Sequence, residues 1–204
     1  MPGTKIDKSR LINVFGGSSL RIKYKDVFSI DELYIAMMEW LREYGWKDYY
    51  EDSDELWETF YSEKVGSGGA KNITIWWRLQ RKPNNAEQIH YYLDVDFMSF
   101  AVVPTEVIKD GHKISTFKGE LEITINGFVD KKYLDTLDKN SLLKTMKEFF
   151  VRDVYDPGPF VKELYQELYA FQNFIKQWFK MKRYLPYQET KGFFPSHSWP
   201  THQK

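Results

Sequence analysis

The 204-residue sequence contains no cysteine, and this excludes disulfide bonds, thiolate metal ligands and cysteine nucleophiles. It also lacks an excess of charge of either sign, because Lys and Arg total 29 and Asp and Glu total 29. A protein dedicated to nucleic acid normally carries a basic excess or a basic patch. We therefore expect no nucleic-acid partner.

Long apolar runs are missing as well. No run approaches the roughly 18 apolar residues that indicate a membrane-spanning helix. The N-terminal residues MPGTKIDKSR lack the apolar core of a signal peptide. These absences predict a cytoplasmic protein without a transmembrane segment.

Motifs that accompany cofactors, metals or common catalytic sites are absent too. The sequence has no G-x-S-x-G, H-E-x-x-H, kinase or nucleotide-binding signature. His197 and His202 are separated by five positions with Pro200 between them, so one helix face cannot present both as zinc ligands. No cofactor and no metal site are predicted.

Aromatic residues, in contrast, make up 18% of the chain, and many lie in residues 159–184. The apolar residues that recur there at three- and four-residue spacing are Phe160, Val161, Leu164, Tyr165, Leu168, Phe171, Ile175, Trp178 and Phe179. This spacing predicts a long helix that begins at Pro159 and ends before Pro186. We expect it to pack on a sheet; a cavity wall and a membrane-surface helix are the alternatives.

Two elements precede the predicted sheet. Alternation over residues 20–25 predicts a first strand, and Ser29 with Glu32 forms a capping box that opens a helix. The apolar face of that helix comprises Leu33, Met37, Trp40, Leu41 and Tyr44, and Gly45 ends it. The acidic segment that follows, residues 48–58, is interpreted as a solvated turn, with weak cation or basic-partner binding as the alternative.

A period of two then predicts antiparallel strands over residues 58–65, 71–81, 89–103 and 117–129, with a short strand pair around Asp110-Gly111. The fold class is α+β: a curved antiparallel sheet of about five or six strands packed on the long C-terminal helix. One short extra helix is expected over residues 141–150. The domain organisation is a flexible leader over 1–17, one domain over 18–187 and a proline-punctuated tail over 188–204.

The two sheet faces differ in composition. The core face is predicted to carry Ile73, Ile75, Trp77, Leu79, Ile89, Tyr91, Leu93, Val95, Phe97, Leu121, Ile123 and Ile125. The candidate interaction face on the other side comprises Trp76, Arg78, Tyr92, Asp94, Asp96, Glu120 and Glu122. Its four carboxylates are interpreted as a solvated face with cross-strand ion pairs. A metal or acid–base site and a protein-binding face, which the two aromatic residues favour, are the alternatives.

The order strand, capped helix, antiparallel meander and long final helix resembles the helix-grip arrangement of START-like lipid- and hormone-binding domains. That resemblance implies an apolar ligand between the sheet and the final helix. The rings expected to line such a cavity are Trp77, Tyr91, Phe97, Tyr165, Phe171 and Trp178. The strings W-x-x-E-Y-G-W, T-I-W-W-R and L-D-V-D-F also resemble small uncharacterised archaeal proteins, which bring no known activity.

Three functions remain open from the residues alone. The first is a non-enzymatic interaction or adaptor domain that binds a protein partner through the candidate interaction face or through the acidic segment with its Tyr and Trp residues, and we favour it narrowly. The second is a carrier or sensor of an apolar small molecule or lipid. The third is a carboxylate-based hydrolase. A cavity between the predicted lining rings would favour the carrier, whereas a solid core with exposed Trp76, Tyr92 and Tyr49 would favour the adaptor.

Overall fold

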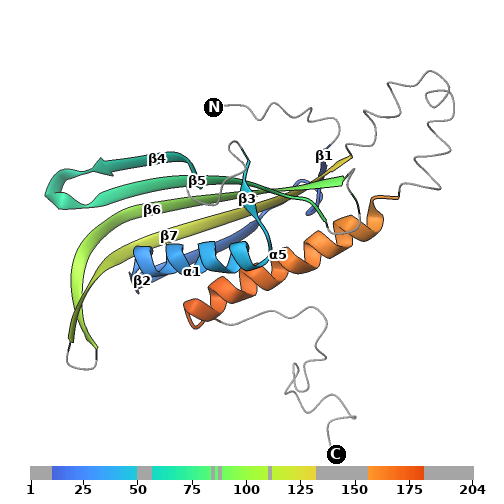
Figure 1. Ribbon diagram of the computed structural model, residues 1–204. Coiled ribbons are helices and arrows are strands. Elements are labelled where there is room, and N and C mark those ends of the chain that lie inside the picture. The colour runs from blue at the N-terminus through green and yellow to red at the C-terminus, as the bar shows by residue number, and fades with distance from the viewer. Residues whose placement is uncertain are drawn as a thin grey trace, which may run out of the picture.

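The computed structural model describes residues 11–49, 57–83, 86, 89–109, 112–131 and 156–181. Over these residues the protein is an open, antiparallel seven-stranded sheet with two helices, which confirms the predicted α+β class (Figure 1). The strands are β1 (Leu11–Asn13), β2 (Leu20–Phe28), β3 (Lys47–Asp48), β4 (Glu58–Val65), β5 (Lys71–Arg81), β6 (Ile89–Lys109) and β7 (His112–Lys131). The helices are α1 (Ile30–Glu43) and α5 (Gly158–Trp178), and a short 3₁₀ turn, η2 (Ser67–Gly69), joins β4 to β5.

The sheet is built around three long consecutive strands. β5 pairs with β6 and β6 pairs with β7, as the short connections predict. On its other side β7 pairs with both β2 and β1, and β5 pairs with both β4 and β3. The 3₁₀ turn lies where the glycine-rich residues 66–69 predict a hairpin, since Gly68 and Gly69 adopt positive φ angles that favour glycine.

Strands β6 and β7 are longer than predicted. β6 extends to Lys109, and β7 begins at His112. These two residues pair with each other, so the two strands flank the predicted Asp110-Gly111 turn. The register shifts between Phe100 and Val103, and Ala101 adopts a φ of 48°. A bulge of this kind bends a strand pair. Beyond it the hairpin curls toward the side on which the helices lie (Figure 1).

Two short strands were not expected. Leu11–Asn13, within the predicted flexible leader, pairs with Asp130, Val129 and Phe128 of β7, and Lys47–Asp48 pairs with β5. The pairing partner, which is distant in sequence, supplies the hydrogen bonds that make these few residues strands. Residues 1–10, the predicted helix over 141–150 and the tail over 188–204 lie outside the described residues.

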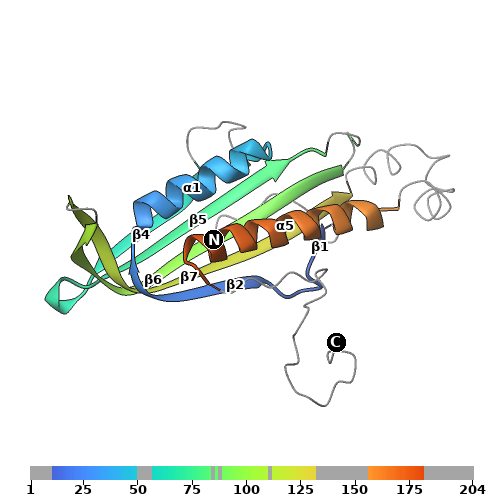
Figure 2. The same ribbon diagram turned by 90° about the horizontal axis from the view of Figure 1, so that it is seen from below.

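Both helices lie on one face of the sheet, side by side (Figures 1 and 2). The residues predicted for the core face are all buried beneath them. The predicted capping of α1 is confirmed, because the Ser29 hydroxyl accepts a hydrogen bond from the Glu32 amide at 3.3 Å. Along α5, Leu164, Leu168, Phe171 and Ile175 are fully buried against the sheet.

Helix α5 ends at Trp178, six positions before the predicted end at Tyr184. The Met181 amide donates to the Lys176 carbonyl at 2.7 Å, and the Lys180 amide donates to the Gln177 carbonyl at 2.9 Å. These two bonds, with Lys180 at a φ of 54°, form the Schellman motif that terminates helices. Glycine usually occupies that position, so a lysine there gave no signal in the sequence.

Candidate binding groove

The six rings predicted to line a cavity make separate contacts within the described part of the chain. Trp77 packs edge-on against Phe97 and Tyr34, each at 4.7 Å between ring centroids. Phe171 packs instead on Trp40 of α1 at 4.9 Å. Tyr91 is fully buried under the opposite end of the helices.

The other two predicted lining residues are both on α5 and have different surroundings. Tyr165 packs on Phe15 and Tyr169, and 39% of Trp178 is exposed at the end of α5. Around Gly127 of β7, the seam between α5 and the sheet is filled by Leu164, Leu168 and Val14. A Cβ atom at Gly127 would lie 2.3 Å from the Leu168 Cδ1 atom. α5 thus packs directly on the sheet backbone there.

Open space lies instead beside the first turns of α1. A groove of about 410 Å³, which we call the α1 groove, separates this helix from β4, β5 and β7. It is lined by Ile30, Asp31, Tyr34, Ile35, Glu58, Tyr61, Glu63, Lys71, Ile73, Ile75 and Phe117. A second hollow of about 450 Å³, under the curled β6–β7 hairpin, adjoins it through Asp31 and Phe117.

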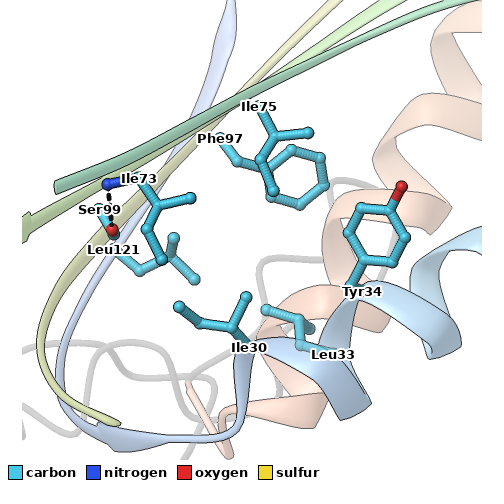
Figure 3. Close-up of a pocket in the computed structure, with 8 residues that line it drawn as sticks. All are labelled: Ile30, Leu33, Tyr34, Ile73, Ile75, Phe97, Ser99 and Leu121. Carbon is cyan, nitrogen blue, oxygen red and sulfur yellow. Dashed lines mark hydrogen bonds between the residues drawn. The ribbon is translucent and has the colours of Figure 1, made fainter. Parts of the chain in front are cut away.

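The inner end of the groove is apolar and narrows to a gap of about 10 Å³, just room for one water molecule (Figure 3). Ile30, Leu33 and Tyr34 of α1 point toward the sheet there, as Figure 3 shows. Opposite them lie Ile73, Ile75, Phe97, Ser99 and Leu121. The Ser99 hydroxyl accepts a hydrogen bond from the Ile73 amide at 2.9 Å, so its polar group is satisfied within the sheet.

A hydrogen-bonded chain connects the core to the rim of the groove. The Trp77 indole N–H donates to the Tyr34 hydroxyl at 3.1 Å, and that hydroxyl donates to the Glu58 carboxylate. Burial raises the pKa of Tyr34, and the hydrogen bond to Glu58 and its negative charge raise it further. Tyr34 therefore stays protonated and holds the Glu58 carboxylate at the rim.

The rim along β4 and β5 holds a second fixed carboxylate. The Glu63 carboxylate lies 2.8 Å from the Lys71 Nζ atom and accepts a hydrogen bond from the Tyr61 hydroxyl at 2.9 Å. The Lys71 hydrogen bond, followed by the Tyr61 hydrogen bond, lowers the pKa of Glu63. With Asp31 and Glu58, the α1 groove thus has three carboxylates and one ammonium group around an apolar floor.

The candidate interaction face has the ion pairs of a polar sheet surface. The Arg78 guanidinium lies 2.7 Å from the Asp96 carboxylate and 3.5 Å from that of Asp94. The Glu122 carboxylate lies 3.0 Å from Arg21 and 2.8 Å from Lys23, both on β2. Glu120 is on the same face of β7, opposite Lys25 in the register.

Burial raises the pKa of Asp94 to about 6; Arg78 acts against this shift and the Asp96 charge adds to it. The four carboxylates share one face, as predicted, and three of them are held by basic residues. Within the described part of the chain, no three His, Asp or Glu side chains are placed to hold a metal ion.

The aromatic residues of that face are less accessible than predicted. Only 5% of Tyr92 is exposed, and its ring packs edge-on against Tyr49 at 5.4 Å. Trp76 is half-buried between the Phe60 ring, at 4.4 Å, and the Arg78 guanidinium, at 5.5 Å. Exposed apolar surface is provided instead by their neighbours Phe60, Met98 and Phe100.

Four groove residues were not singled out from the sequence: Tyr34, Tyr61, Glu63 and Lys71. Glu58 ends the acidic segment for which weak cation or basic-partner binding was the alternative interpretation. One signal could have revealed three of the four. In the register Tyr61 lies opposite Ile75, and Glu63 lies opposite Ile73, so both belong to the core-facing row of their strand. Lys71 continues the same row of β5. Polar residues in a core-facing row indicate that the sheet is uncovered there.

Comparison of the chain with protein-family models, with curated proteins and with solved structures gives no match. None of the helices in the described residues is long and apolar enough to cross a membrane.

Proposed function

We propose that the protein binds a small amphipathic molecule in the α1 groove, as a carrier or sensor. The groove itself carries this proposal. Its volume of about 410 Å³ lies within the range of small-molecule sites, roughly 300–1,000 Å³. Seven of its eleven lining residues are hydrophobic or aromatic and four are charged, which fits the usual composition of such sites.

The groove also differs from a packing defect. Tyr34 and Glu58 form one hydrogen-bonded set, and Tyr61, Glu63 and Lys71 form a second set held by a hydrogen bond and an ion pair. Side chains that are already ordered lose little conformational entropy when a ligand binds. A prearranged rim therefore favours binding at this site.

Binding of the neutral, solvent-sensitive dye Nile red tests the proposal. Ile35 is 49% exposed at the mouth of the groove, so Ile35→Trp places a large ring in the groove without replacing a core residue. Ile108→Trp is the matched control, because Ile108 is 71% exposed on the β6–β7 hairpin and does not line the groove. We expect Ile35→Trp to weaken dye binding at least about tenfold and Ile108→Trp to leave it unchanged. Equal affinity in the two variants would contradict the proposed site.

A protein-interaction function is the second candidate, and a specific observation favours it. Phe60, Met98 and Phe100 are each close to 40% exposed, and Phe60 packs on Trp76. The sheet face that carries Trp76 is covered by neither α1 nor α5 (Figures 1 and 2). Aromatic residues and methionine are enriched in protein interfaces. A photo-crosslinking side chain at Phe100 should capture a partner that the same group at Ile108 does not. Identical products from both positions would argue against this face.

A further inference from the structure

We propose that the ligand of the α1 groove is a small amphipathic cation, with an apolar body and one ammonium-type head. This inference rests on the proposed function, because it names the chemical class that the same groove would select. The charge of the rim and the composition of the floor carry it together. The charge of the rim disfavours anions, and the apolar floor disfavours ligands that have no apolar part.

The rim favours a positive charge. Of its three carboxylates, Glu63 is neutralised by Lys71 at 2.8 Å. Glu58 is held by a neutral phenol, and among the described residues neither Glu58 nor Asp31 forms an ion pair. Glu106 in the adjoining hollow is paired with Lys113 at 3.0 Å. Among the described residues, the groove therefore presents two carboxylates without an ion-pair partner and no ammonium group without one.

Other nearby cations do not reverse this balance. Arg42 acts on Tyr34 through space, but its guanidinium lies over the Trp57 ring at 5.6 Å and does not line the groove. An anionic ligand would therefore meet net repulsion at the rim. A cationic head would be attracted to Glu58 and Asp31 and would find the rings of Tyr61 and Phe117, whose π faces also attract cations.

The floor requires an apolar body. Ile30, Ile73 and Ile75 line the inner part of the groove, and burial of apolar ligand surface against them is favourable. A polyamine or a free metal ion has no apolar part to place there. An alkyl- or arylammonium compound satisfies both the floor and the rim.

Three probes with one alkyl chain test the inference: decyltrimethylammonium, decyl sulfate and decanol, each used below its micelle concentration to displace Nile red. An exposed charge pair changes affinity by roughly two- to fivefold, so two carboxylates should favour the cation over the sulfate by about tenfold at low salt. Added salt should reduce that preference. Glu58→Gln keeps an acceptor for Tyr34 and should lower the ratio of cation to decanol affinity several-fold. Glu39→Gln, an exposed position of α1 outside the groove, makes the same charge change and should leave the ratio unaltered.

The outcomes separate the two proposals. If the three probes bind equally, or the sulfate binds most tightly, the cationic class is wrong and the groove remains a binding site. An equal drop in the ratio of cation to decanol affinity for Glu39→Gln and Glu58→Gln would also overturn the inference. The net charge of the whole protein, and not Glu58 itself, would then explain the preference for the cation. If neither decanol nor either ion displaces the dye from the unmodified protein, the proposed function fails and this inference fails with it.

Discussion

The substitution Gly127→Ala tests whether the seam between α5 and the sheet is as tightly closed as the structure shows. An added Cβ atom would lie 2.3 Å from Leu168 Cδ1 and 3.6 Å from both Leu164 Cδ2 and Val14 Cγ2. Leu168 is fully buried, so it can only move into occupied space. Extra atoms in a packed core cost about 1–3 kcal/mol. Replacing a strand glycine by alanine recovers up to about 1 kcal/mol of that cost.

We therefore expect Gly127→Ala to lower the free energy of unfolding by about 0.5–2 kcal/mol. Urea denaturation followed by aromatic fluorescence measures this change. Gly66→Ala is the matched control, since its backbone φ is negative and its nearest neighbour, the Ala70 carbonyl oxygen, lies at 3.4 Å. The control should stay within about 0.5 kcal/mol of the unmodified protein.

A double-mutant cycle makes the test specific to the Gly127–Leu168 contact. Leu168→Ala alone should cost about 2–5 kcal/mol because it leaves a cavity. In the double variant the new methyl group enters that cavity. The double variant should therefore lose about 1–3 kcal/mol less unfolding free energy than the two single variants lose together. Strict additivity, or a Gly127→Ala protein as stable as the control, would refute the close packing and would reopen the seam as a ligand site.

Two further predictions concern buried charge. Because the pKa of Asp94 is raised from 3.8 to about 6, its contribution to stability is full below pH 3.8 and is lost as the pH rises through about 6. The unfolding free energy of Asp94→Asn should therefore fall less steeply between these pH values than that of the unmodified protein. Equal slopes in the two proteins would contradict this prediction. Arg81 binds Glu167 of α5 at 2.7 Å, both are largely buried, and burial raises the pKa of Glu167. Arg81→Met should consequently cost about 3–5 kcal/mol in urea denaturation at neutral pH, and Arg81→Met with Glu167→Leu should restore most of it; a double variant as unstable as the single one would show that the loss does not come from an unpaired charge.

Local chemistry allowed much of the fold to be predicted. The core-facing row from Ile73 to Leu79 follows from the alternation of side chains along a strand, which depends only on backbone geometry. The start of α1 follows from the Ser29 cap, a hydrogen bond that spans three residues. The α+β class required no more than these patterns in sequence.

The position of the site was decided by contacts between distant residues. The bulge near Ala101 bends the β6–β7 hairpin, and the residue with the positive φ is an alanine, not the glycine that usually indicates such a backbone. The glycine lies on the opposite strand, at Gly119, where a Cβ atom would be 2.7 Å from Val102 Cγ1. Gly127 and Leu168 are 41 positions apart in the chain, and their contact closes the seam at which a ligand was expected.

The sequence by itself determined which side chains face the core and where the main elements begin, because periodicity and capping act over a few residues. Only the tertiary structure decided where that core is solid and where it opens. α5 packs directly on the sheet at Gly127, whereas the first turns of α1 leave a groove that Ile73 and Ile75 line together with Tyr61 and Glu63. Space between elements depends on how closely whole helices approach the sheet, and no local pattern of residues encodes that distance.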